Sequence, residues 1–275
     1  MLPGGQAEQM NRWWFGIYIL VVTGVLAGEE AIGQQGRPSP EAKDREESGV
    51  TDDQGAIIRG DTSQKTIHLA FTGHEFADGA GTVTRTLKKQ QVKASFFFTG
   101  DFCRRYPRIV KRLKKSGHYI GPHSDKHLLY CDWKNRDSLL VTEAEFMSDL
   151  QNNYTALEQL NIAKSAAALF MPPYEWYNAT IVEWGKKAGV KTVNFTPGTS
   201  SNADYTTPDM PNYRSSETLF NRILAYEKES SVGLNGFHLL IHIGTDPKRK
   251  DKLYDRLEEL IKYLKQKNYR FEVIK

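Results

Sequence analysis

The sequence predicts an α/β fold in which parallel strands alternate with helices, as a barrel or as a wound sheet. Strand-like apolar segments and amphipathic helical segments alternate over roughly 210 residues. The run 92–99, which contains three successive phenylalanines, is continuously apolar, as expected of a strand buried on both faces. Histidine, acidic and aromatic residues gather directly after five predicted strands, and such strand ends meet at one face of a parallel fold.

The individual elements follow from hydrophobic periodicity and turn residues. Order is expected to begin near Ile57, and the polar turn 60–65 between residues 57–59 and 66–71 predicts a strand hairpin. The later predicted strands are 92–99, 118–120, 167–171, 190–195, 237–243 and 269–274. The predicted helices are 82–90, 106–115, 142–160, 181–187, 215–228 and 252–265.

The chain divides into three segments. Residues 15–27 form an uncharged apolar run after Arg12, too short to span a bilayer but typical of a secretory signal, so 1–27 is predicted to be a signal peptide. Residues 28–55 are rich in Gly, Pro and charge and are predicted to be a flexible linker, and 56–275 to be the folded domain. We therefore expect export to a periplasmic or extracellular location with no stable membrane span after cleavage. An uncleaved anchor is the alternative.

Composition restricts the partners. The 275 residues, 39% of them apolar, suit one core. Residues 28–64 carry four basic and nine acidic side chains, so the net charge of +4 comes from the remainder, which favours acidic polymers. No basic block with interleaved aromatic residues is present, so nucleic acid is not expected as a partner. Cys103 and Cys131 lack metal-site spacing; their pairing, like the oligomeric state, stays open.

The segment 121–127 contains the strongest local signal. His123 and His127 are four residues apart, and in a helical turn two such imidazoles can point at one ion, most commonly zinc. Buried or helix-capping histidines are the alternative interpretation.

Five segments in order resemble the polysaccharide deacetylases, carbohydrate esterase family four. They are the first-motif strand 67–71, the V-K-A-S-F-F-F-T-G run 92–100, the His-Ser-x-x-His run 123–127, the Pro-Pro-Tyr run 172–174 and the L-x-x-H run 239–242. The resemblance covers residues 57–275 and implies a distorted, incomplete (β/α) barrel. It implies metal-dependent removal of acetyl groups, most simply the N-acetyl groups of amino sugars, from a poly- or oligosaccharide.

The resemblance also implies roles. A divalent ion, typically Zn²⁺, lowers the pKa of a bound water and polarises the acyl carbonyl. A carboxylate takes the proton of that water, and a histidine, here His242, donates one to the leaving amine. The backbone N–H at the position of Tyr174 helps to hold the oxyanion.

The first motif departs from the family. In the family this motif is T-F-D-D-G, and its two aspartates supply the base and a metal ligand. In this sequence Thr72 and Gly73 stand at the positions of the two aspartates. His74 is the favoured third ligand, because three histidines suit zinc. Asp78 is the alternative ligand, or merely a helix cap, and Glu75 is a further nearby carboxylate.

The third and fourth motifs also differ. Met171 replaces the family's arginine, and Glu175 is the best replacement base, a solvated loop acid being the alternative. Trp176 and Tyr177 offer faces on which a sugar could stack, unless they pack in the core. Asp204 is a substrate-binding candidate or, like Asp246 and Asp125, a partner of His242.

Three functions are compatible with these residues. The favoured one is a polysaccharide deacetylase that hydrolyses amide bonds with a remodelled first motif. The alternatives are a catalytically degenerate relative that binds carbohydrate and an esterase that removes O-acetyl groups from a polysaccharide.

Overall fold

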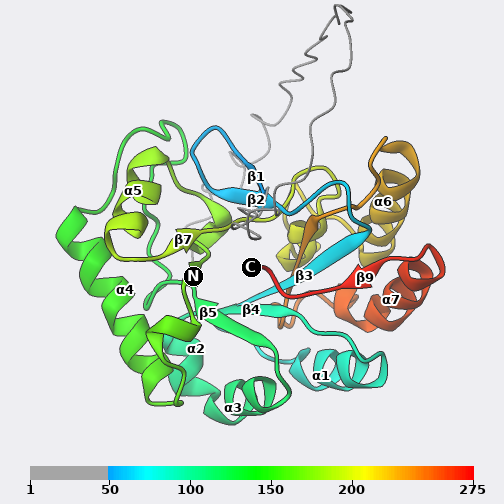
Figure 1. The fold of residues 1–275 in the computed structure, drawn as a ribbon, viewed down its shortest axis with the longest axis horizontal. Helices are drawn as coiled ribbons and strands as arrows, with labels where there is room; N and C mark the ends of the chain where they lie inside the picture. Colours follow the sequence, from blue (N-terminus) through cyan, green and yellow to red (C-terminus); the bar gives the residue numbers. More distant parts are fainter. Residues whose placement is uncertain (1–48) are drawn as a thin grey trace, which may run out of the picture.

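Parallel strands occupy the centre of the domain and helices surround them (Figure 1) in the computed structural model, which describes residues 49–275. The central strand β3 (Thr66–Gly73) pairs in parallel with β4 (Ser95–Phe98), β8 (Phe237–His242) and β9 (Arg270–Phe271). Strand β5 (Tyr119–Pro122) continues the sheet beyond β4. Because these strands run in the same direction, their carboxyl ends lie at one edge.

The helices cover the outside of the strands. They are α1 (Ala80–Lys89), α2 (Gly100–Arg105), α3 (Pro107–Lys115), α4 (Glu143–Glu158), α5 (Ala179–Lys187), α6 (Ser216–Glu229) and α7 (Leu257–Gln266). Every predicted helix is present, whereas α2 was not predicted, because its six residues are too few to show a helical period. The Thr142 side chain begins α4 in a reciprocal capping box with Glu145.

The barrel is closed by few hydrogen bonds. Strands β6 (Leu169–Phe170) and β7 (Lys191–Thr192) form a separate parallel pair. The Met171 N–H donates to the Pro122 carbonyl at 3.2 Å, and a single bridge joins Val193 to Ile57. The predicted distorted, incomplete (β/α) barrel is therefore confirmed.

The predicted hairpin of residues 57–59 and 66–71 is wrong. Strand β2 (Ile57–Arg59) pairs antiparallel with β1 (Val50–Thr51) and, through Arg59, with Phe237 of β8. It cannot pair with β3, because both edges of β3 are already occupied by β4, β8 and β9.

The folded domain begins earlier than predicted. Strand β1 lies inside the segment 28–55, and the Tyr177 hydroxyl donates to the Asp52 carboxylate at 2.6 Å, so the last residues of the predicted linker belong to the domain. The predicted signal peptide 1–27 and the linker up to residue 48 lie outside the described residues. Within residues 49–275, no helix has the length and apolar character needed to cross a membrane. Cys103 and Cys131 are buried free thiols.

Candidate active site

Four of the predicted site residues lie at the carboxyl ends of strands. His74 follows β3, His123 follows β5, Glu175 lies shortly after β6, and His242 is the last residue of β8. The registers of β3 with β4 and with β8 place Thr72 beside both Phe97 and His242. The fold therefore gathers these residues at one edge, as predicted.

The His123–His127 segment is a loop and not the predicted helical turn. Ser124 and His127 have left-handed backbone angles, with φ of 72° and 57°. A helix cannot contain such residues. The histidine pair therefore owes its geometry to the loop and not to helical spacing.

Helix α4 holds this loop through two side chains one turn apart. Asn153 accepts the His123 N–H at 2.9 Å and donates to the Phe98 carbonyl, which ties the loop to β4. Asp149 accepts the N–H groups of Asp125 and Lys126 at 3.0 and 3.1 Å. Helix α4 thus supplies hydrogen-bond acceptors for the buried N–H groups of the loop and holds the loop in place.

Asp125 is a structural residue of the same loop. Its carboxylate is buried and receives two hydrogen bonds from the Arg104 guanidinium, at 2.8 and 3.0 Å. A bidentate pair of this kind fixes orientation as well as charge. Asp125 is therefore occupied by Arg104, which excludes the predicted alternative that it is the partner of His242.

Three imidazoles cluster at this edge. The rings of His74 and His127 stack with centroids 4.6 Å apart and planes at 8°, and His123 lies edge-on to His127 at 5.1 Å. The His123 Nδ1 lies 2.7 Å from the Met171 carbonyl and donates to it, which leaves Nε2 with the lone pair. Burial lowers the pKa of His123 to about 3 and that of His127 well below its ordinary value, so both rings are neutral.

In their present orientations, the rings of His74, His123 and His127 do not form a metal centre. The donors suit zinc, since they are neutral imidazoles and His123 is fixed by a backbone carbonyl. However, a nitrogen lone pair lies in its ring plane, and the nearly parallel planes of His74 and His127 do not meet at a common point. Across residues 49–275, no three His, Cys, Asp or Glu side chains are arranged to hold an ion.

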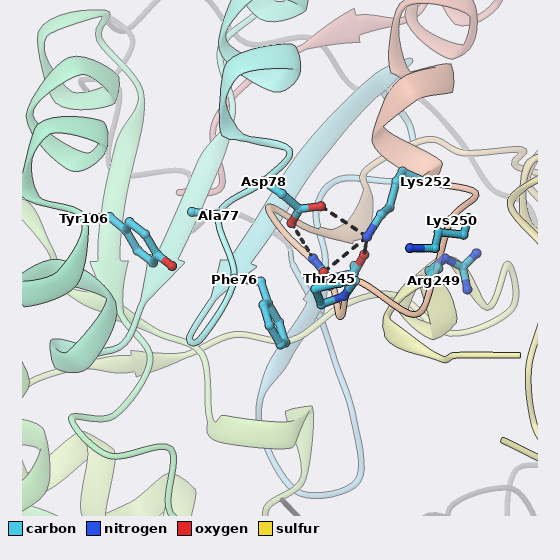
Figure 2. Close-up of a pocket in the computed structure, with 9 residues that line it drawn as sticks. Phe76, Ala77, Asp78, Tyr106, Thr245, Arg249, Lys250 and Lys252 are labelled. Carbon is cyan, nitrogen blue, oxygen red and sulfur yellow. Dashed lines mark hydrogen bonds and ion pairs between the residues drawn. The ribbon is translucent and has the colours of Figure 1, made fainter. Parts of the chain in front are cut away.

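The two carboxylates proposed near His74 are directed elsewhere. Asp78 accepts a hydrogen bond from the Tyr254 hydroxyl. It also accepts the Thr245 N–H, and its carboxylate lies 3.2 Å from the Lys252 ammonium (Figure 2). Glu75 is exposed. The prediction of Asp78 as an alternative ligand is therefore wrong, because a neighbouring ammonium already neutralises its charge.

Thr72 and Gly73, which stand where the family has its first-motif carboxylates, differ in the space available for a side chain. A Cβ on Gly73 would lie 2.9 Å from each of Ile243, Phe102 and Phe98, so no side chain fits there. The Thr72 side chain is buried, and its hydroxyl has no hydrogen-bond partner among the described residues. Apolar side chains therefore occupy the space that a carboxylate at position 73 would need.

His242 has a dedicated carboxylate. Its Nδ1 lies 2.6 Å from one oxygen of Asp204, and its backbone N–H donates to the other oxygen at 2.9 Å. Burial lowers the pKa of His242, but the Asp204 carboxylate raises it by more, so the net shift is upward. Asp204 is buried and holds His242, which corrects its assignment as a substrate-binding residue. Asp246 instead accepts the Lys248 N–H.

Glu175 is a perturbed and strained acid. Burial raises its pKa to about 7, while the nearby charges of His242 and Asp204 act on it in opposite directions. Tyr174 and Glu175 both have left-handed backbone angles, with φ of 59° and 54°. Two adjacent non-glycine residues in this region store strain of the kind found at functional sites. The burial of Glu175 therefore argues against the alternative interpretation, in which it is a solvated loop acid.

The aromatic residues divide into one structural and several accessible side chains. Tyr177 is buried and bonded to Asp52 and Asn194, so its predicted role in substrate binding is wrong. Trp176 is half-buried and packs against Trp133, whose ring centroid also lies 5.5 Å from that of Tyr174. Trp133 was missed in the sequence, because a lone aromatic residue in a long loop carries no periodic signal.

Comparisons with known proteins agree with this architecture. Residues 59–193 match the family profile described as polysaccharide deacetylase. The peptidoglycan-N-acetylmuramic acid deacetylase PdaA of Bacillus subtilis is 33% identical over 138 residues, which are 50% of this chain and 49% of that protein. The match thus spans about half the length of that relative.

Two solved structures share the fold. A peptidoglycan N-acetylglucosamine deacetylase superposes with a TM-score of 0.63 at 22% identity, covering 79% of this chain and 89% of that one. A family-four pseudoenzyme from Bacillus anthracis superposes with a TM-score of 0.63 at 19% identity, covering 81% and 68%. The fold is therefore similar both to a deacetylase and to a pseudoenzyme.

Proposed function

Because the chain belongs to the polysaccharide deacetylase family, we propose that it hydrolyses the N-acetyl groups of amino sugars in a poly- or oligosaccharide. The single observation that carries this proposal is the arrangement of Glu175, His242 and Asp204 at the strand ends. It combines an acid whose pKa is near neutrality with a histidine oriented by a carboxylate, the two groups that amide hydrolysis requires.

In the proposed reaction Glu175 is the general base. Its carboxylate removes a proton from a water molecule as the water oxygen adds to the acetyl carbonyl carbon, which gives a tetrahedral oxyanion. A carboxylate with a pKa of about 7 is partly ionised at neutral pH and is basic enough to accept that proton.

His242 is the proposed general acid. Its protonated ring gives a proton to the amine nitrogen as the carbon–nitrogen bond breaks, which releases acetate and a free amino sugar. Asp204 raises the pKa of His242 and holds Nδ1, so that Nε2 is the nitrogen that donates. The backbone N–H of Tyr174 is the proposed oxyanion donor, carried on the strained turn that also carries Glu175.

A divalent ion, most simply Zn²⁺, is proposed at His123, His127 and His74. These neutral imidazoles supply suitable donors, but His74 has to leave its stack on His127 before its ring plane can contain the ion. When bound, such an ion would polarise the acetyl carbonyl. The proton transfers above are assigned to this chain's own side chains.

Peptidoglycan or a related N-acetylated glycan is the proposed substrate, since the named relatives act on peptidoglycan. Export to the periplasm or the cell exterior, after loss of residues 1–27, is proposed from the apolar N-terminal run. A wall glycan would be accessible to a protein in that location.

A second candidate is glycan binding without hydrolysis. It is favoured by the packing around Gly73, where the first-motif carboxylate has no room, and by the pseudoenzyme among the structural neighbours. An O-acetyl esterase would use the same groups on an ester bond.

The experiment is measurement of acetate released by the purified chain from peptide-free peptidoglycan strands, from chitooligosaccharides and from an O-acetylated xylan. The deacetylase proposal expects acetate from an N-acetylated glycan and none after His242→Ala. Binding of these glycans without acetate release supports the second candidate, and release from xylan alone supports the esterase.

A further inference from the structure

A cavity of about 380 Å³ lies between the β3–α1 and β8–α7 connections (Figure 2). Both connections begin at the candidate active site. Phe76 is two residues beyond His74, and Thr245 is three beyond His242, so the cavity lies within about 10 Å of the site along either chain path. The cavity is therefore a neighbour of the candidate site at the same end of the strands.

The two connections fit closely together. A Cβ on Gly244 would come within 2.4 Å of the Ala77 nitrogen, so the two backbones are in close contact. Asp78 also accepts the Thr245 N–H at 2.9 Å. These contacts hold the walls in a fixed relation, as a preformed binding site requires.

Basic side chains dominate the lining. Arg249, Lys250 and Lys252 line the cavity together with a single acid, Asp78. The Lys252 ammonium is used internally, since it donates to Thr245 and lies 3.2 Å from Asp78. The charge of Asp78 is therefore already neutralised and does not repel an incoming anion.

Arg249 adds a buried positive charge beneath the cavity. Its side chain is fully buried and lies 3.6 Å from the carboxylate of Asp251. Both terminal nitrogens of the guanidinium donate hydrogen bonds, to the carbonyls of Thr206 and Arg214 and to the Ser216 hydroxyl, and only Nε has no partner in the described part of the chain. A partly compensated buried charge is poorly screened by solvent.

Lys250 is the free cation of the cavity. It is exposed, and within residues 49–275 it forms no ion pair or hydrogen bond. Its ammonium lies on the same side of the cavity as that of Lys252, above Thr245 (Figure 2). Phe76 also lines the cavity and supplies an aromatic face against which a sugar ring can pack.

We propose that this cavity is a subsite for a carboxylate-bearing sugar of the glycan, with Lys250 pairing with the carboxylate and Phe76 packing against the ring. The inference rests on the proposed function, since it names the class of substrate for the same site. An acidic sugar is favoured over a neutral one because a neutral sugar would leave the Lys250 charge unmatched.

The test is calorimetric binding of two oligosaccharides of equal length. One is a neutral chitooligosaccharide, and the other is a peptide-free glycan strand of alternating N-acetylglucosamine and N-acetylmuramic acid, which carries carboxylates. The wild type is expected to prefer the acidic strand by about two- to fivefold at low salt, and less at high salt.

Lys250→Gln is expected to remove this preference while leaving the affinity for the neutral oligosaccharide unchanged. Lys248→Gln is the matched control, because Lys248 is exposed, pairs with Asp209 and does not line the cavity. Equal affinity of the wild type for both strands, or an unchanged preference in Lys250→Gln, would overturn the inference.

The outcomes for the subsite and for the proposed reaction can be separated. Preference for the acidic strand through Lys250 without acetate release contradicts the deacetylase proposal and supports the subsite. Acetate release from both strands with no effect of Lys250→Gln supports the deacetylase proposal and contradicts the subsite.

Discussion

His242 and Asp204, which are 38 residues apart in the sequence, are joined by two hydrogen bonds, at the ring Nδ1 (2.6 Å) and at the backbone N–H (2.9 Å). One carboxylate thus fixes both the position of the strand end and the orientation of the imidazole. The same carboxylate stabilises the protonated ring, which raises the pKa of His242. This relationship makes His242 suitable as a proton donor.

Asp204→Asn is expected to lower the rate of acetate release by about 10²- to 10⁴-fold, because the protonated form of His242 loses its counter-charge. The alkaline limb of the pH–rate profile is expected to move to lower pH, since the pKa of His242 falls. Asp246→Asn is the control, as Asp246 bonds the Lys248 N–H and not His242. An unshifted alkaline limb in Asp204→Asn would show that Asp204 has only a structural role.

Gly73→Asp is expected to lower the free energy of unfolding by about 2 kcal/mol or more, because its Cβ collides with Phe98, Phe102 and Ile243. Restoring the family carboxylate at this position is therefore not expected to add a fourth protein ligand to the proposed zinc site. Gly81→Asp is the control, since Gly81 is exposed in the first turn of α1, where an acid is favourable. Chemical denaturation measures both, and equal stability of Gly73→Asp and wild type would contradict the packing argument.

The sequence predicted the fold well where local pattern decides it. The continuous apolar run at Phe96, Phe97 and Phe98 predicted a buried strand, and β4 contains all three. The pairing of β2 could not be predicted, because it depends on which strand edges remain free after the sheet has formed. Short segments such as α2 carry too little period to be seen.

The candidate site was predicted only in part. His242 and Glu175 stood out because their residue types and positions after strands are informative. The Asp204 contact is formed across 38 residues, and spacing alone could not distinguish it from Asp246. Tyr177 was assigned to the substrate surface because an aromatic residue beside a site is equally compatible with sugar stacking and with core packing. Its buried hydroxyl bonds to Asp52 and Asn194, which are distant in the sequence, and no local pattern encodes these contacts.

The free energy of unfolding is expected to fall as the pH is lowered below about 6.5, because the buried His238 cannot readily be protonated in the folded state. Burial lowers the pKa of His238 to about 3, so between pH 6.5 and 3 the unfolded chain binds more protons than the folded one. His238 alone would contribute about 1.4 kcal/mol per pH unit in that window. Thermal denaturation across pH 4–8 tests this, and His238→Asn should reduce the slope; an unchanged slope would assign the effect to other groups.

Purified wild-type chain is expected to bind one Zn²⁺, and His74→Ala is expected to reduce the zinc content by more than half, because His123 and His127 alone provide only two protein ligands. His118→Gln is the matched control, since His118 lies at the opposite end of β5 from His123. Elemental analysis after dialysis measures both variants. Full zinc content in His74→Ala would show that His74 is not a ligand.

If Glu175 is the base of an active deacetylase, its titration governs the pH dependence of acetate release from an N-acetylated glycan. For the wild type, kcat/KM should rise as the pH increases through about 7, where Glu175 loses its proton, and fall again above the raised pKa of His242. Glu175→Gln should remain folded and lose about 10²- to 10⁴-fold in rate, together with the acidic limb. Acetate release by Glu175→Gln at the wild-type rate, with the acidic limb intact, would show that Glu175 is not the base.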